Sequence, residues 1–79
     1  MFKNKANGRN NICGIKIAIL RKNYQPKMSQ RMLADRCQLN GIDIDKNAIQ
    51  RIESGQRFIT DIELKCFCEI FDVSADELF

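Results

Sequence analysis

Five polar side chains between residues 46 and 54 are spaced so that they fall on one face of a helix: Lys46, Asn47, Gln50, Arg51 and Ser54. At about 100° per residue they span a sector about 140° wide, and none of them is acidic. Arg and Lys hydrogen-bond well to guanine, and Asn and Gln hydrogen-bond well to adenine. This face is therefore a candidate for reading base edges; the alternative is an ordinary solvated helix face.

The composition offers little support for catalytic or metal-binding chemistry. The chain has no His, which is the commonest general base and metal ligand. Its four cysteines lack C-x-x-C spacing, which favours buried thiols over a zinc or disulfide site; they are Cys13, Cys37, Cys66 and Cys68. No Ser has a His base, and no paired carboxylates form a recognisable site. We therefore expect no enzymatic activity, no metal and no cofactor.

Charge is distributed unevenly along the 79 residues. Residues 1–57 contain twelve Lys and Arg against four Asp and Glu, a net charge of +8. Residues 58–79 contain one Lys against six acids, a net charge of −5. This polarity indicates that the first two-thirds of the chain meets a polyanion such as nucleic acid, or else that it is a solvated basic surface without a partner.

The length fits a single domain with a small core. The longest apolar run, Ile17 to Leu20, is far too short to span a membrane. Residues 1–10 are rich in Asn and Lys and lack the apolar centre of a secretory signal, so a cytoplasmic location is expected. We divide the chain into a flexible basic leader, residues 1–10, and a folded domain, residues 11–79.

Capping residues predict three helices in the first two-thirds of the chain. Asn10 or Asn11 is the expected cap of a first helix that ends near Asn23. Ser29 is the expected N-cap of a second helix, and Asp45 that of a third.

Two further helices are predicted in the last third. Gly55 ends the third helix, and Thr60 with Glu63 forms a capping box that opens a fourth. Ser74 with Glu77 forms a second capping box, which predicts a short terminal helix. No strand pattern is present, so the expected fold is all-α with five short helices.

Residues spread from position 14 to position 79 form a wider pattern. It consists of Gly14, Ile17, Leu20, Arg21, Lys22, Ser29, Gln30, Leu33, Ala34, Ile49, Arg51, Ile52, Glu53, Gly55 and the ending from Asp72 to Phe79. This pattern resembles the Cro/phage-repressor (XRE-type) helix-turn-helix DNA-binding family. The resemblance implies a five-helix, phage-repressor-like fold in which the second and third helices form the helix-turn-helix.

The resemblance also implies roles for individual side chains. The residues implied to read bases in the major groove are Lys46, Asn47, Gln50 and Arg51. The residues implied to contact phosphates are Gln30, Arg31, Ser54, Gln56 and Arg57. Arg21 and Glu53 are implied to form a structural ion pair that orients the third helix, with Arg21 on a phosphate as the alternative.

Two segments depart from the family's usual pattern. The linker from Asn23 to Met28 is about two residues longer than usual. The turn is also longer, because six residues, Gln38 to Asp43, stand where the family has one Gly. We expect either a longer loop or a second helix extended to Leu39 or Asn40.

Together these features predict a sequence-specific, double-stranded DNA-binding transcriptional regulator, with repression as the expected role. A homodimer on half-sites about 34 Å apart is expected, with Phe58, Ile59 and Phe79 as candidate contacts or else as core residues. The alternatives are an antitoxin-like or co-regulator module that binds protein, and an RNA binder. The basic leader either wraps the duplex as an arm or is disordered.

Overall fold

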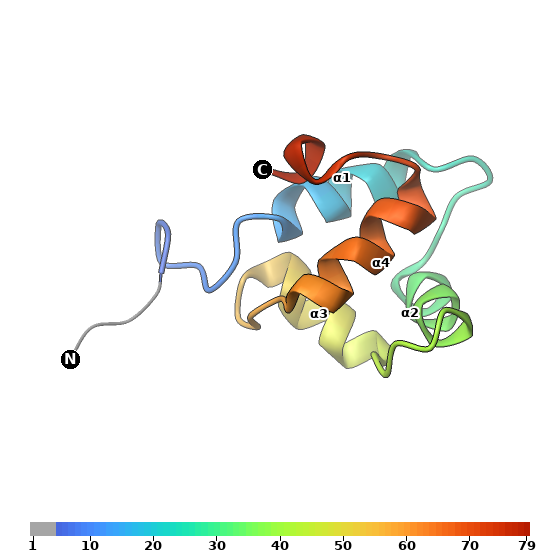
Figure 1. Ribbon diagram of the computed structural model, residues 1–79, viewed down its shortest axis with the longest axis horizontal. Helices are drawn as coiled ribbons and strands as arrows, with labels where there is room; N and C mark the ends of the chain where they lie inside the picture. The colour runs from blue at the N-terminus through green and yellow to red at the C-terminus, as the bar shows by residue number, and fades with distance from the viewer. Residues whose placement is uncertain (1–4) are drawn as a thin grey trace.

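The computed structural model of the protein describes residues 5–79, which form four α-helices and a terminal 3-10 helix (Figure 1). The elements are α1 (Gly14–Asn23), α2 (Gln30–Leu39), α3 (Lys46–Ser54), α4 (Asp61–Phe71) and η1 (Ala75–Leu78). Residues 5–79 contain no strand, only an isolated bridge between Ala6 and Arg9. The all-α prediction is confirmed, but the fifth helix is one turn of 3-10 helix and not an α-helix.

Three of the predicted N-terminal caps are confirmed by their hydrogen bonds. The Ser29 side chain accepts from the Met32 amide, and the Asp45 carboxylate accepts from the Ala48 amide. Thr60 opens α4 with a complete capping box. Each cap satisfies an amide that has no partner inside its own helix.

The first helix begins later than predicted, at Gly14. Cys13 occupies the N-cap and makes no side-chain capping bond there. The Asn11 side chain still supplies an acceptor, because its Oδ1 takes the Gly14 amide at 2.8 Å. Asn11 therefore still caps the first amide of α1, although it lies three residues before the helix begins.

The prediction of a second capping box, from Ser74 and Glu77, is wrong. Ser74 precedes η1 without a side-chain capping bond, and the Glu77 amide donates to the Ser74 carbonyl at 3.1 Å. In a 3-10 turn the backbone itself uses that amide, so the Ser hydroxyl has no donor to accept from.

Each α-helix contributes fully or almost fully buried side chains to one core. Ile17, Leu33, Ile52 and Phe67, from α1 to α4 in turn, have no exposed surface, and neither does Leu78 of η1. The helix pairs in contact include α2 with α3 and α1 with α3. The third helix is therefore held on its inner side by both of the helices that precede it.

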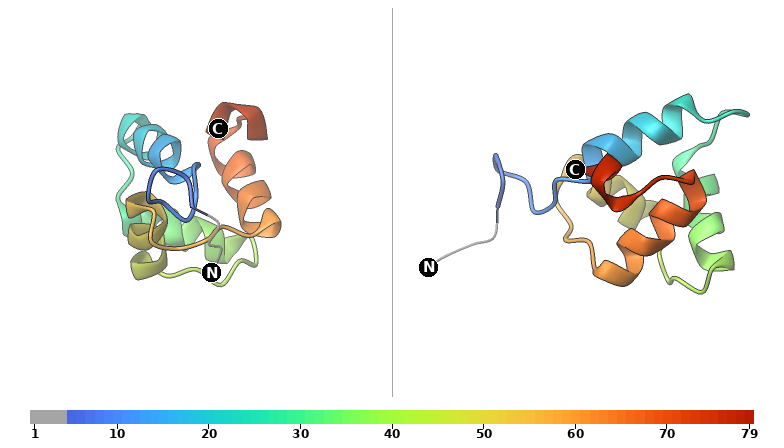
Figure 2. Two further views of the ribbon diagram at one scale, coloured as in Figure 1. Left: turned by 90° about the vertical axis from the view of Figure 1, so that its left-hand side faces the viewer. Right: turned by 45° about the horizontal axis from the view of Figure 1, so that its top comes forward.

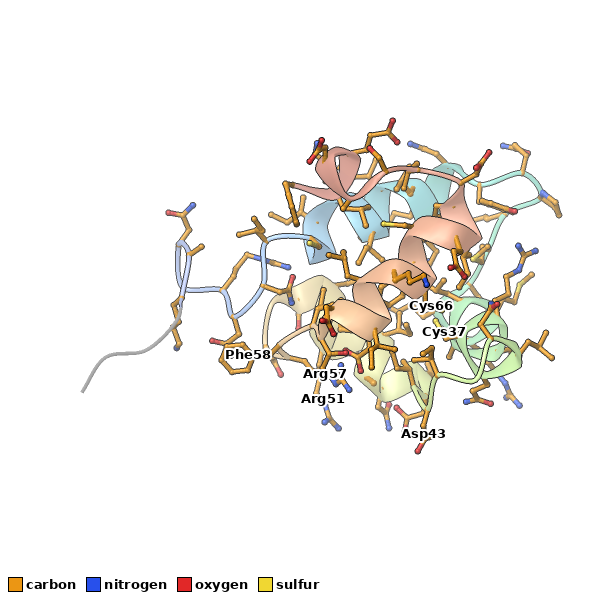
Figure 3. All side chains as sticks on the ribbon, viewed as in Figure 1. Cys37, Asp43, Arg51, Arg57, Phe58 and Cys66 are labelled. Atoms are coloured by element: carbon orange, nitrogen blue, oxygen red, sulfur yellow. The ribbon has the colours of Figure 1, made fainter. Side chains whose placement is uncertain are left out.

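The cysteines behave as small apolar residues. Cys13, Cys37 and Cys66 are buried, Cys68 is half-buried, and all four thiols are free. Burial raises the pKa of the Cys37 thiol to about 12, and the neighbouring Cys66 adds to that shift (Figure 3). These thiols stay protonated, which fits a packing role.

The long turn between α2 and α3 contains both of the expected features, an extended second helix and a longer loop. The helix α2 extends to Leu39, and a loop then turns at Gly41, where φ is 80°. The loop is tied back to α2, since the Gln38 side chain donates to the Ile44 carbonyl at 3.0 Å. Ile44 is fully buried, so the start of α3 is anchored to the core despite the extra length.

We predict that Asp45→Ala destabilises the protein by about 1 kcal/mol, because it removes the cap of α3. Asp43→Ala is the matched control, since Asp43 points into solvent in the same loop and loses the same charge (Figure 3). It should change the unfolding free energy by less than about 0.5 kcal/mol. Urea unfolding measures both, and equal losses would contradict the capping role.

Candidate nucleic-acid interface

The outer face of α3 is polar and open along its whole length. Lys46, Asn47, Gln50, Arg51 and Ser54 are all exposed. The opposite face supplies fully buried isoleucines to the core. Figure 3 shows the Arg51 side chain pointing away from the body of the protein. The side chains expected to read bases therefore share one accessible surface.

Gln56, the second residue after α3, extends this surface. Gln56 is exposed, and it lines a shallow hollow together with Asn47, Gln50, Arg51 and Ser54. The Ser54 hydroxyl donates to the Arg51 carbonyl at 3.2 Å. The structure thus gathers base-reading and phosphate-contacting candidates in one place.

A second, larger hollow lies at the start of α2. Its lining includes the exposed cations Lys27, Arg31 and Lys46, together with Gln30 in the first turn of the helix. The amide end of a helix carries partial positive charge and attracts anions. This hollow is suited to a phosphate group, and Lys46 connects it to the outer face of α3.

The Glu53 carboxylate joins α3 to the two preceding helices. Arg21 approaches it with Nε at 2.7 Å from Oε2 and with a second nitrogen at 3.0 Å from Oε1. The Gln30 amide donates to Oε1 at 3.0 Å. Arg21, which is buried, also donates to the Met28 carbonyl at 3.1 Å. Arg21 and Glu53 thus lie together as the resemblance implied.

Gln30 has a partner that the sequence analysis did not foresee. An amide group carries two hydrogens, and the bond to Glu53 uses one of them. Glu53 therefore holds in place the Gln30 side chain, which lines the α2 hollow.

Arg57 is paired with a carboxylate of α4 in the free protein. Its two terminal nitrogens lie 2.8 and 3.0 Å from the two oxygens of Glu63. Burial tends to raise the pKa of Glu63, but hydrogen bonds from Arg57 and Thr60 outweigh it and hold that pKa below its ordinary value. The pair fixes the loop after α3 against α4, which the sequence analysis did not predict.

Residues 9–11, at the junction of the predicted leader and the folded domain, also make contacts that sequence reasoning missed. Arg9, Asn10 and Asn11 donate hydrogen bonds to carbonyl groups at and just after the end of α3. The acceptors are backbone groups, which carry no sequence signal. Lys3, another basic residue of the predicted leader, lies outside the described residues.

Neither a metal centre nor a membrane span is found in the part of the chain that the structure describes. Across residues 5–79, no three His, Cys, Asp or Glu side chains gather where they could hold a metal ion. No helix within this range is both long enough and apolar enough to cross a bilayer.

The fold and the open face of α3 define a helix-turn-helix protein. The sequence profile of the helix-turn-helix family matches residues 17–78, and the chain belongs to this family, of the Cro/phage-repressor (XRE) type. It is a DNA-binding family and not a family of enzymes. Comparisons with curated proteins and with solved structures give no significant match.

We predict that Glu53→Ala lowers the unfolding free energy by about 2–4 kcal/mol, because it leaves the buried Arg21 without its counter-charge. Gln50→Ala, on the exposed face of the same helix, should cost less than about 0.5 kcal/mol. Thermal and urea unfolding compare the two variants. Similar melting temperatures would show that the ion pair does not hold α3 in place.

Proposed function

We propose that this protein is a sequence-specific regulator of transcription that binds double-stranded DNA and inserts α3 into the major groove. The observation that carries the proposal is the outer face of α3, on which five polar side chains are exposed and none is acidic. An exposed helix face with guanidinium, ammonium and amide groups matches the donors and acceptors on base edges.

In this proposal two groups of side chains have different roles. Lys46, Asn47, Gln50 and Arg51 contact base edges and select the sequence. Phosphate contacts set the register, and they come from Gln30, Arg31, Ser54, Gln56 and Arg57. Arg57 has five N–H donors, so a phosphate can share it with Glu63.

The proposed biological role is repression by occupancy of an operator. A bound domain that covers promoter DNA blocks transcription without a further activity. The proposed site of action is the cytoplasm of a bacterial cell or of the host of a mobile element, with residues 11–79 as the DNA-binding domain.

We further propose a homodimer, since one recognition helix reads only part of a turn of DNA. Ile12, Phe58 and Phe79 are 50%, 56% and 57% exposed, and they line a hollow together with the half-buried Ile59 and Leu64. Two copies that bury this surface against each other would present two copies of α3 to half-sites about 34 Å apart.

The alternative is a module that binds another protein, and the same exposed apolar surface is the observation that favours it. Salt separates the two functions. Affinity for a duplex should fall steeply as salt rises, with a log–log slope set by the number of phosphates neutralised. No measurable duplex binding, or binding without such a slope, would favour the protein-binding module.

We predict that Asn47→Ala weakens binding to a duplex selected by the wild-type protein from random sequences by about 1–3 kcal/mol. A scrambled duplex of the same length should bind almost as before, because the substitution removes no charge. Gln30→Ala, equally neutral, should weaken both duplexes by the same factor. Fluorescence anisotropy measures all four affinities, and equal losses on both duplexes with Asn47→Ala would refute base reading.

We predict that Phe58→Glu raises the dimer dissociation constant at least about tenfold, because a buried carboxylate costs more than 1.4 kcal/mol. Ile62→Glu is the matched control, since Ile62 is 65% exposed on α4 and does not line the Phe58 hollow. Sedimentation equilibrium reports both constants. A dimer weakened by Ile62→Glu but not by Phe58→Glu would place the interface elsewhere.

A further inference from the structure

The segment just before α1 lies against the end of α3, as the ribbon views show from two sides (Figures 1 and 2). One terminal nitrogen of Arg9 donates to the Glu53 carbonyl at 2.8 Å and to the Ile52 carbonyl at 3.3 Å. Its Nε donates to the Asn11 carbonyl at 3.2 Å. The Arg9 guanidinium is thus directed at the backbone of α3.

The two asparagines extend the contact into the loop after α3. The Asn10 side chain donates to the Gln56 carbonyl at 2.8 Å, and its backbone amide donates to the Gly55 carbonyl at 2.8 Å. The Asn11 side chain donates to the Ile52 carbonyl at 3.0 Å and to the Arg57 carbonyl at 2.7 Å.

These hydrogen bonds stabilise the C-terminal end of α3. The last carbonyls of an α-helix have no partner within the helix, and that end carries partial negative charge. Arg9 supplies a donor to the Glu53 carbonyl and adds a positive charge there. The Ile52 carbonyl, which also accepts from the Gly55 amide at 3.1 Å, takes further bonds from Arg9 and Asn11. The same segment therefore fixes both the last turn of α3 and the backbone of Gln56 and Arg57.

Two glycines make the close approach possible. A Cβ atom at Gly14 would overlap the Ile52 carbonyl oxygen and lie 2.7 Å from a terminal nitrogen of Arg9. A Cβ atom at Gly55 would lie within 2.9 Å of three side-chain atoms of Arg9. Gly55 also has a φ of 86°, which L side chains rarely adopt. The shape of α1 and of the loop after α3 is therefore matched to the Arg9 side chain.

We propose that the segment 9–11 is a positioning element for DNA recognition, which sets how α3 and the Gln56–Arg57 loop meet the duplex. It precedes the residues that the family profile matches, and it acts through α3 and not by touching DNA. This inference rests on the proposed function. Arg9 is the positioning residue whose removal tests it.

The test compares Arg9→Ala with Lys5→Ala, because each removes one positive charge from the leader and Lys5 is exposed. The probes are a duplex selected by the wild-type protein from random sequences and a scrambled duplex of equal length. Arg9→Ala should weaken the selected duplex by about 5- to 30-fold and the scrambled duplex by less than about threefold. Lys5→Ala should change both duplexes by one small factor.

Hydrogen exchange provides a readout that needs no DNA. With Arg9→Ala the amides of residues 52–57 should exchange faster, whereas Lys5→Ala should leave them unchanged. Arg9→Lys keeps the charge but not the planar group of donors, so it should retain scrambled-duplex affinity and recover only part of the selected-duplex affinity. This variant remains informative if Arg9→Ala folds poorly.

Three results would overturn the inference. Equal weakening of both duplexes by Arg9→Ala, with a smaller salt slope, would make Arg9 a direct phosphate contact. Faster exchange with unchanged sequence preference would make the segment purely structural. If the wild-type protein selects no sequence, both the proposed function and the positioning role are wrong. If the wild-type protein selects a sequence and Arg9→Ala selects it equally well, only the positioning role is wrong.

Discussion

The Glu53 carboxylate determines how α3 sits in this protein. A charge removed from water must be paired, and Glu53 is paired with Arg21 of α1 and hydrogen-bonded by Gln30 of α2. These bonds come from two different helices, so they leave α3 little freedom to rotate about its axis. With that rotation fixed, the polar side of α3 must face outward.

Core packing and contacts at both ends of α3 fix the position of this helix together with the ion pair. Ile49 and Ile52 fill the core beneath α3 and bring it against α1 and α2. Asp45 caps the first turn, and donors from residues 9–11 satisfy carbonyls of the last turn. Arg57 then ties the following loop to α4 through Glu63. A helix of only nine residues is thereby held along its length and presented as a rigid surface.

The features that could be predicted from sequence depend on residues close together in the chain. The caps Ser29, Asp45 and Thr60 each act on an amide three residues away, and the two faces of α3 follow from helical spacing. The capping box predicted at Ser74 does not form, although its residue spacing is the same. The chain makes a 3-10 turn there, in which the Ser74 carbonyl accepts from the Glu77 amide.

The contacts that were missed depend on how segments of the folded chain lie relative to one another. Arg9 meets α3 through backbone carbonyls 43 and 44 residues away, and any residue type could supply such an acceptor. The Arg57–Glu63 pair spans a loop whose path no local rule specifies. Which side chains are free for DNA, and which are held within the protein, therefore needed three-dimensional coordinates.

Whether the outer face of α3 binds DNA is decided most directly by an NMR titration of the labelled protein with a duplex that it has selected. We expect the side-chain signals of Asn47, Gln50 and Arg51 to shift most, along with backbone amides at the start of α2. Shifts confined to the apolar surface around Phe58 and Phe79, with the α3 side chains unchanged, would show that α3 does not enter the duplex.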